Sequence, residues 1–232
     1  MSGDKFSLLF LGKADDAGSS RALEFCRARF TPLTAGLGRW GDPFPSEAAE
    51  WTGDYIISYL SRWVVPEILL RRARKAAINF HPAPPEYPGI GCNNFALYEN
   101  AKEYGVTCHH MAAKVDSGSI IAVKRFPVHA EDNVESLLQR TYEHQIELFF
   151  EIAGLMAEGK DLPVSPEKWA RPPYTRAQFD ELFRITPGMG KDEIARRVRA
   201  VNYQQWGPYV EIEGYRFQYR PAPGSPDSGQ AQ

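Results

Sequence analysis

The feature that most constrains the fold is an alternation of short apolar segments and helical patterns along the first two thirds of the chain. Residues 5–12, 54–60 and 76–80 are typical of strands that are buried on both faces. Between them, residues 20–30 and 66–75 place apolar side chains at helical spacing. Repeated strand–helix–strand units predict an α/β fold, with a mostly parallel, twisted sheet and helices on both faces.

The longest predicted helix covers residues 133–158. Asp132 and Glu135 resemble a capping box at its start, and Gly159 is expected to end it. Its core-facing stripe is expected to consist of Val134, Leu138, Tyr142, Phe149, Ala153 and Met156. A shorter helix is expected from Asn93 to about Ala101, and further strands lie in residues 105–115 and 119–128.

The composition changes after Gly159, so we expect a main domain in residues 1–160 and an extension in residues 161–220. The extension begins with a proline-rich connector and continues with short helices at residues 176–183 and 191–201. Its end is typical of a β-hairpin that turns near Glu213 and Gly214. One hairpin cannot bury all of its aromatic residues, which must pack on the main domain or on another chain. The tail, residues 221–232, has no apolar content and is predicted to be disordered.

Charge and cysteine usage exclude several classes of protein. The net charge of −2 on 232 residues leaves no electrostatic footprint for nucleic acid. The basic runs at residues 71–75 and 196–199 fall late in predicted helices, where solvated cations are favoured. The three cysteines form no CxxC pair and show no metal cluster, which favours a reducing compartment over a disulfide framework. No apolar run is long enough for a signal peptide or a membrane span, so we expect a cytoplasmic protein.

Two polar residues end the strand at residues 76–80, where ligands bind in sheets of this kind. Asn79 offers an amide N–H to an oxyanion, and His81 can accept and return a proton near neutral pH. Four prolines follow within residues 82–88 and limit the motion of the loop that carries His81.

A carboxylate is the group that best orients a catalytic imidazole, and Asp116 in the turn Asp-Ser-Gly is the candidate. Each of these residues also has an ordinary structural interpretation, since Asn and Asp are common turn formers. His109 and His110 lie on opposite faces of their strand, and we expect one in the core and one at the surface. From spacing alone, acyl transfer remains one alternative.

Two stretches together resemble the signature of the N10-formyltetrahydrofolate-dependent formyltransferases. These are INFHPAPPEYPGIG (residues 78–91) and GVTCHHMAAKVDSGSII (residues 105–121). The family's N-x-H-P motif matches residues 79–82, its D-x-G motif residues 116–118, and its V-T-x-H run residues 106–109. The family includes glycinamide ribonucleotide, methionyl-tRNA and sugar-amine formyltransferases. The order of elements resembles the family over residues 5–160.

The resemblance implies a role for each motif residue. His81 would accept the proton of the attacking amine, Asn79 would hold the formyl group and its oxyanion, and Asp116 would support His81 and the departing folate nitrogen. N10-formyltetrahydrofolate is the implied cosubstrate, and no metal or covalent intermediate is implied. The residues implied to bind it are Ser58, Tyr59, Leu60, Trp63, Ala112 and Val115.

The sequence after residue 160 limits which molecule can accept the formyl group. The family's tRNA enzyme has a larger, basic C-terminal barrel, whereas residues 161–232 are short and near neutral, so we disfavour tRNA. The stretch at residues 81–99 and the ending NYQQWGPYVEIEGYRFQY are similar to compact nucleotide-sugar N-formyltransferases. The resemblance implies a homodimer that acts on dTDP- or GDP-linked amino-dideoxy sugars in surface glycan synthesis, such as that of lipopolysaccharide O-antigen.

Three residues are candidates for binding this substrate. Lys13 could meet the pyrophosphate at a strand end, with a solvated loop lysine as the equal alternative. Tyr87 and Trp206 could contact the substrate, Trp206 by stacking on the base, and core packing is the competing interpretation of both. The alternative functions are a formyltransferase for another small amine, such as a glycinamide ribonucleotide, and a folate-binding or hydrolytic relative.

Overall fold

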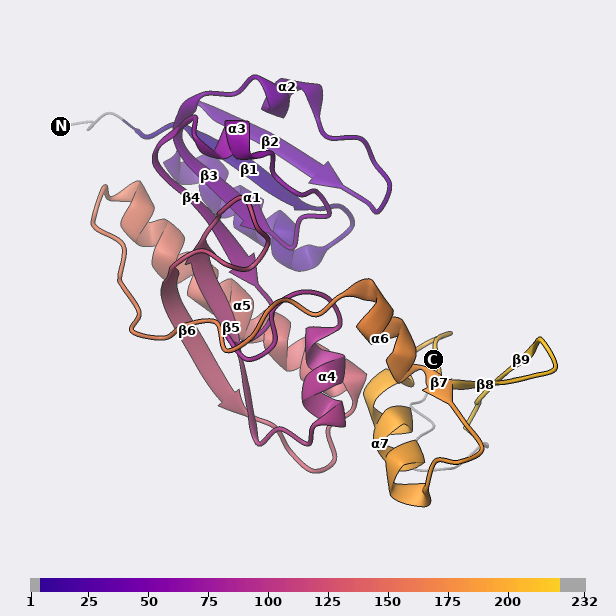
Figure 1. Cartoon of the computed structure of the whole chain (residues 1–232). Helices are drawn as coiled ribbons and strands as arrows, with labels where there is room; N and C mark the ends of the chain where they lie inside the picture. Colours follow the sequence, from indigo (N-terminus) through magenta and orange to yellow (C-terminus); the bar gives the residue numbers. More distant parts are fainter. Residues whose placement is uncertain (1–4, 222–232) are drawn as a thin grey trace.

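The computed structural model of the protein describes residues 5–221 and is built around a six-stranded sheet (Figure 1). The order of its strands is β2-β1-β3-β4-β5-β6. They are β1 (Leu8–Lys13), β2 (Leu33–Gly38), β3 (Gly53–Tyr59), β4 (Ala73–His81), β5 (Glu103–His110) and β6 (Ile120–Pro127). Pairing is parallel from β2 to β4 and antiparallel between β4, β5 and β6. The predicted α/β class and mostly parallel sheet are confirmed.

Helical segments cover both faces of this sheet. Along β1, Leu8 and Phe10 pack into a core with α1 (Ala17–Arg29) and α5 (Val134–Ala157). Leu9 and Leu11 point to the other face, where they pack with residues of α2 (Ser46–Ala49) and α3 (Glu67–Leu70). Because successive strand residues point to opposite faces, a strand between two cores must be apolar on both, as Leu8 to Leu11 of β1 are.

One prediction about the N-terminal half is wrong, and one strand there, β2, was not predicted. The helix predicted at residues 66–75 is only one turn long, because Ala73 already pairs with Gly53 of β3 and residues 73–75 belong to β4. Strand pairing therefore overrides helical propensity there. The two glycines in β2 weaken its strand pattern, and Gly38 is needed because the Trp63 ring lies 2.2 Å from where its Cβ would be.

The start and the core stripe of α5 also differ from expectation. Asn133 is the N-cap and forms the capping box with Ser136, while Asp132 accepts hydrogen bonds from Ser136 and Arg140. Gly159 follows the helix with φ 67°, as expected for the residue that ends it. Leu138 and Tyr142 are only partly buried, and the buried stripe runs instead through Leu137, Thr141, Gln145, Ile146, Leu148 and Ile152 with the remaining predicted positions.

The C-terminal part forms a small second unit beside α4 (Cys92–Tyr98) (Figure 1). It contains α6 (Arg176–Leu182), α7 (Lys191–Val201) and a three-stranded sheet of β7 (Arg184–Ile185), β8 (Tyr209–Ile212) and β9 (Tyr215–Gln218). The hairpin and its turn at Glu213 and Gly214 are confirmed. The C-terminal unit contacts the main sheet domain through α7, because the Asn94 amide of α4 donates a hydrogen bond to the Ala200 carbonyl of α7 at 2.6 Å.

Aromatic side chains of the hairpin remain on the surface of this chain, with Tyr215 73% and Phe217 56% exposed. The domain boundary near residue 160 stays a prediction. The predicted disordered tail lies outside the described residues except for Pro221. No helix within residues 5–221 has both the length and the apolar character needed to cross a membrane.

Candidate active site

Four polar side chains meet where β4 and β5 lie side by side. Asn79 and His81 are two residues apart on β4, and so they point to the same face of the sheet. His109 of β5 is the direct cross-strand partner of Asn79. The loop after β5 brings Asp116 between the two histidines, 3.4 Å from His81 Nδ1 and 3.4 Å from His109 Nε2. The structure thus brings together the three predicted catalytic residues and adds His109.

Asp116 is held as a buried carboxylate. Its backbone has φ 45°, and the Gly89 N–H donates to its Oδ2 at 2.8 Å. Burial acts to raise the pKa of this carboxyl, but His81, His109 and the Gly89 N–H together outweigh it and lower the pKa to about 2. Asp116 therefore remains ionised at every pH at which an amine substrate could react.

The contacts of His81 indicate which ring nitrogen can accept a proton. Nε2 lies 2.9 Å from the Tyr87 carbonyl oxygen, which can only accept, so Nε2 carries the hydrogen. In the neutral ring Nδ1 is then the basic nitrogen, and it faces the Asp116 carboxylate. A proton that arrives at Nδ1 is stabilised by the carboxylate on one side of the ring and the Tyr87 carbonyl on the other.

His109 fixes the orientation of Asn79. Its Nδ1 lies 2.8 Å from the His110 carbonyl oxygen and donates to it, which leaves Nε2 as an acceptor in the neutral ring. The Asn79 amide nitrogen lies 3.1 Å from that Nε2 and donates to it. One of the two amide hydrogens is used in this contact, and the second remains available. His109 is 2% exposed and His110 is half-buried, so His109 is the member of the pair that lies in the core, where it contacts Asn79 and Asp116.

Trp169 from the proline-rich connector closes the far side of this cluster. Its ring lies edge-on to His81 and His109, with centroid distances of 5.7 Å and 5.0 Å. Its indole N–H donates to the Gly118 carbonyl at 2.8 Å, two residues after Asp116. The connector therefore both shields the two imidazoles and holds the loop that carries the carboxylate.

The loop after His81 is tied down on both sides. The hydroxyl groups of Tyr104 and Thr107 on β5 donate to the carbonyls of Pro82 and Ala83 at 3.0 Å and 2.7 Å. Tyr174 of the connector donates its N–H to the Pro88 carbonyl at 2.9 Å. Contacts from both sides thus add to the constraint that the prolines impose.

A cavity of about 410 Å³ opens beside the four side chains. Of the residues implied to bind the cosubstrate, Ser58, Leu60, Trp63, Ala112 and Val115 line it. Tyr59 does not, because the strand alternation turns its fully buried ring into the core against Phe80 and Phe149. The cavity is also lined by residues that the sequence interpretation missed, among them Trp40, Arg62, Val65, Leu70, Ile90 and Met111.

The three candidate substrate-binding residues lie apart from one another. Lys13 ends β1, where its ammonium group lies 3.3 Å from Asp16 and 5.8 Å from the centre of the Tyr142 ring. Tyr87 turns its ring into the core, with its hydroxyl on Glu99, so it meets the site only through its carbonyl. The Tyr87 side chain is not part of the lining of this cavity. Trp206 lies in a second cavity.

The size and lining of the catalytic cavity suit a folate. The pterin end of a folate is a flat ring system that carries several hydrogen-bond donors and acceptors, and pockets of about 300–1,000 Å³ with apolar walls and a few polar groups hold such ligands. Trp63, Leu70 and Val115 supply the walls, and Asn79 and His81 supply polar groups. Within residues 5–221, no three His, Cys, Asp or Glu side chains are arranged to hold a metal ion.

Residues 44–152 match the family model described as formyl transferase. All four residues of the cluster fall inside this stretch. The family predicted from the motifs is confirmed, whereas Trp169 and the C-terminal unit lie outside the matched stretch.

Three relatives illustrate the likeness. The methionyl-tRNA formyltransferase of Latilactobacillus sakei is 25% identical over 178 residues, which cover 76% of this chain and 55% of that enzyme. The chain thus spans little more than half the length of this relative. A sugar N-formyltransferase from Shewanella is 16% identical with a TM-score of 0.74, and the match covers 93% of this chain and 97% of the other.

The third relative is an N-formyltransferase from Helicobacter canadensis, solved with folinic acid and dTDP-3-aminofucose. It is 18% identical with a TM-score of 0.66, and the match covers 83% of this chain and 79% of that one. At these identities the solved structures show a shared fold. The formyl transferase fold here therefore extends from the matched residues into the C-terminal unit.

Proposed function

We propose that the protein transfers a formyl group from N10-formyltetrahydrofolate to the amine of a dTDP- or GDP-linked amino-dideoxy sugar. The observation that carries the proposal is the cluster of Asn79 with the buried His81 and Asp116 beside a cavity of about 410 Å³. The match to the formyl transferase family supports the transferred group. The Helicobacter canadensis neighbour, solved with a sugar nucleotide, supports the class of acceptor.

His81 serves as the base. The amine nitrogen forms a bond to the formyl carbon and loses one proton, which His81 accepts at Nδ1. The same proton is then given to the nitrogen that leaves the formyl carbon, so His81 ends the cycle neutral. Asp116 keeps its charge throughout and stabilises the imidazolium form, as the buried carboxylate does in other acyl-transfer sites.

Asn79 stabilises the oxygen that becomes negative as the amine attacks. The amide hydrogen that is not used by His109 is free to donate to it, and the site is fixed before the substrate arrives. The donor supplies the formyl carbon and the leaving nitrogen when it is bound. The Trp63 and Val115 walls of the cavity would hold it, together with Ser58, Leu60 and Ala112.

A formylated sugar nucleotide is a precursor for surface glycans, and we propose that the protein makes it for their synthesis. The proposal places the enzyme in the cytoplasm, as a homodimer formed through the hairpin. The cytoplasmic location is supported by three cysteines that are all unpaired, as is usual where thiols stay reduced. The dimer is supported by the exposed apolar side chains of β8 and β9.

The sequence likeness to methionyl-tRNA formyltransferase favours a second candidate acceptor, the amine of an aminoacyl-tRNA. The net charge of −2 argues against it, because binding to nucleic acid depends largely on cationic contacts with phosphates. A hydrolase that releases formate is the remaining alternative, and it needs no amine at all.

The test is a panel of acceptors incubated with N10-formyltetrahydrofolate and analysed by product mass. The panel contains dTDP- and GDP-linked 3- and 4-amino sugars, glycinamide ribonucleotide and methionyl-tRNA. We expect one sugar nucleotide to gain a formyl group, and His81→Ala to abolish the gain. Formylation of methionyl-tRNA alone, or donor turnover that is unchanged by any amine, would contradict the proposal.

A further inference from the structure

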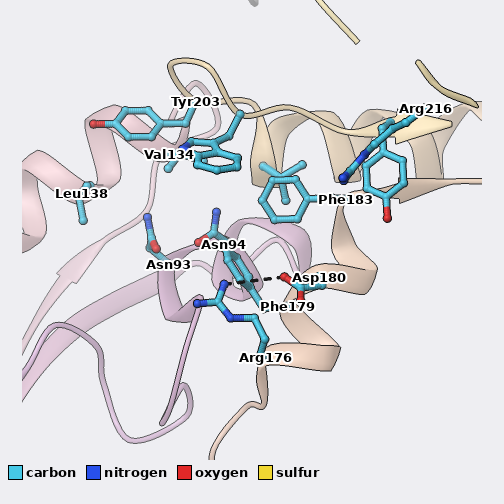
Figure 2. Close-up of a pocket in the computed structure, with 13 residues that line it drawn as sticks. Asn93, Asn94, Val134, Leu138, Arg176, Phe179, Asp180, Phe183, Tyr203 and Arg216 are labelled. Atoms are coloured by element: carbon cyan, nitrogen blue, oxygen red, sulfur yellow. Dashed lines mark ion pairs between the residues drawn. The ribbon is translucent and has the colours of Figure 1, made fainter. Parts of the chain in front are cut away.

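A second cavity, of about 560 Å³, lies between α4, the start of α5 and the C-terminal unit (Figure 2). It is lined by Asn93, Asn94, Val134, Leu138, Arg176, Phe179, Asp180, Phe183, Val201, Tyr203, Trp206, Tyr209 and Arg216. It is comparable in size to the catalytic cavity, and most of its lining residues lie outside the stretch that matches the family model. The catalytic cluster described above makes no use of it.

The two cavities meet at the first turn of α4. Gly91 and Cys92 line the catalytic cavity, and the next residue, Asn93, lines the second one. Phe179 joins them from the other side, since its ring lies 2.2 Å from where a Cβ of Gly91 would be. The start of this helix therefore contributes residues to the lining of both cavities.

The walls of the cavity suit a planar heteroaromatic ring. Five aromatic side chains line it, and Trp206 is 58% exposed on its rim, so core packing does not explain that residue. Phe179 and Phe183 lie edge to face with centroids 5.2 Å apart. Nucleic-acid bases stack on aromatic side chains irrespective of their sequence, because every base has a π face.

One end of the cavity carries an amide with unused hydrogen bonds. Asn93 is only 9% exposed, yet its side chain has no hydrogen-bond partner among residues 5–221. Its neighbour Asn94 differs, because that amide donates to the Ala200 carbonyl. An Asn side chain offers both the donor and the acceptor that the edge of a base requires.

The opposite side carries a guanidinium group without a carboxylate partner. Arg216 lies 3.3 Å above the centre of the Tyr209 ring, and it forms no ion pair with any described residue. Arg176, by contrast, is paired with Asp180 at 3.8 Å. Figure 2 shows the amides and Arg216 on opposite sides of the cavity, with Phe183 between them. A guanidinium is the side chain best suited to a phosphate group.

We infer that this cavity binds the nucleoside diphosphate of the acceptor, with the base between the aromatic walls and Asn93, and with Arg216 on a phosphate. The inference rests on the proposed function, and it assigns the acceptor's nucleotide to the C-terminal unit. The sugar then reaches past the start of α4 toward His81. The C-terminal unit thereby selects the acceptor, while residues 44–152 carry the transfer.

Calorimetric titration with dTDP and with GDP tests the inference without donor or amino sugar. We expect at least one of them to bind the wild-type protein. Asn93→Ala, Trp206→Leu and Arg216→Gln should each weaken that binding on the order of tenfold, which is the usual effect of losing one stacking or charged contact. Arg27→Gln, an exposed arginine in the last turn of α1, is the matched control and should leave it unchanged.

Three outcomes would overturn the inference. They are no binding of either nucleotide, binding that all three cavity variants leave intact, and loss of self-association in the cavity variants with nucleotide binding unchanged. The last would assign the cavity to a second copy of the chain. Circular dichroism and melting temperature confirm that each variant folds. Because the titration contains no formyl donor, its failure leaves the transfer assay to judge the proposed function separately.

Discussion

At the scale of single residues, the site depends on which atoms carry hydrogen. The Tyr87 and His110 carbonyls fix the hydrogens of His81 and His109, and His109 in turn fixes the amide of Asn79. If His109 gained a second proton, its Nε2 could no longer accept from Asn79, and the amide would have to turn. His109 is thus a positioning residue for the group that stabilises the oxyanion.

A double-mutant cycle tests this role of His109. Asn79→Ala should lower kcat on the order of 10²-fold, the usual cost of losing one oxyanion donor. His109→Ala should lower it by a smaller factor, about 10-fold, because the amide is then free to rotate. The double variant should be no slower than Asn79→Ala. Effects that multiply in the double variant would show that His109 acts independently of Asn79.

The ionisation of Asp116 predicts a pH dependence of stability. Its pKa of about 2 in the folded protein lies below the ordinary value of 3.8, so its stabilising contribution is complete above about pH 4 and is lost as the pH falls toward 2. The difference in unfolding free energy between wild type and Asp116→Asn should therefore narrow as the pH falls from about 4 toward 2.

Urea titrations at a series of pH values measure this difference. A narrowing of this difference by about 2 kcal/mol between pH 5 and pH 2 corresponds to the shift in pKa. The account of the buried carboxylate fails if the difference stays constant down to pH 3, or if it grows as the pH is lowered.

At the scale of secondary-structure elements, sequence patterns predicted the helices and strands whose conformation depends on neighbouring residues in the sequence. The buried strands β1, β3 and β4, the helices α1 and α5, and the hairpin follow from apolar spacing and turn residues. The patterns failed where distant pairing decides, as for β2 and for Ala73, whose strand conformation depends on Gly53. Local sequence cannot encode a partner that lies elsewhere in the chain.

In the candidate active site, too, residues in local motifs were predicted and residues placed by tertiary contacts were not. Asn79, His81 and Asp116 were found through motifs that lie within about 40 residues. His109 was undecided because alternation shows that two adjacent histidines face opposite ways, but not which of them faces Asp116. Trp169 gave no signal, since its bond to Gly118 joins residues 51 positions apart through tertiary structure.

The start of α5 offers a direct test of two alternative caps. Asn133 accepts from the Ser136 N–H at 3.0 Å, whereas the sequence pattern had assigned the cap to Asp132 and Glu135. Asn133→Ala should lower the unfolding free energy by about 1 kcal/mol, and Glu135→Ala should have a much smaller effect. Equilibrium unfolding in urea measures both changes in free energy. A larger loss of stability in Glu135→Ala than in Asn133→Ala would contradict the cap formed by Asn133.

The connector supplies another prediction at this scale. Trp169→Phe keeps an aromatic ring against the histidines and removes only the N–H bond to Gly118. We expect it to retain most activity, while Trp169→Ala lowers kcat about 10-fold or more, because a small misplacement of catalytic groups is costly. Its KM for the acceptor should change little, and the pH profile of kcat should shift because water reaches the imidazoles.

Val164→Ala is the matched control, since Val164 lies in the same connector and is 88% exposed. It should leave kcat and its pH profile unchanged. A rise in KM for the acceptor without loss of kcat in Trp169→Ala would contradict a role in positioning the histidines.

At the scale of the whole molecule, the C-terminal unit presents apolar surface that this chain leaves uncovered. Ile212, Tyr215 and Phe217 are each more than half exposed on one two-stranded hairpin. Phe217→Asp should convert a dimer to a monomer in sedimentation experiments, because a buried charge without a partner opposes association. Ile68→Asp, at an exposed apolar residue of α3, should not. A wild-type monomer, or a dimer that survives Phe217→Asp, would contradict the hairpin interface.

The proposed reaction is defined by where the formyl carbon of N10-formyltetrahydrofolate ends. The most direct measurement follows an isotopically labelled formyl group from N10-formyltetrahydrofolate in the presence of the preferred amino-sugar nucleotide. The account predicts that the label is recovered on the sugar amine, in a one-to-one ratio with the tetrahydrofolate released, and that His81→Ala prevents both. Label recovered as formate, at a rate that does not depend on the amino sugar, would contradict it and identify a hydrolase.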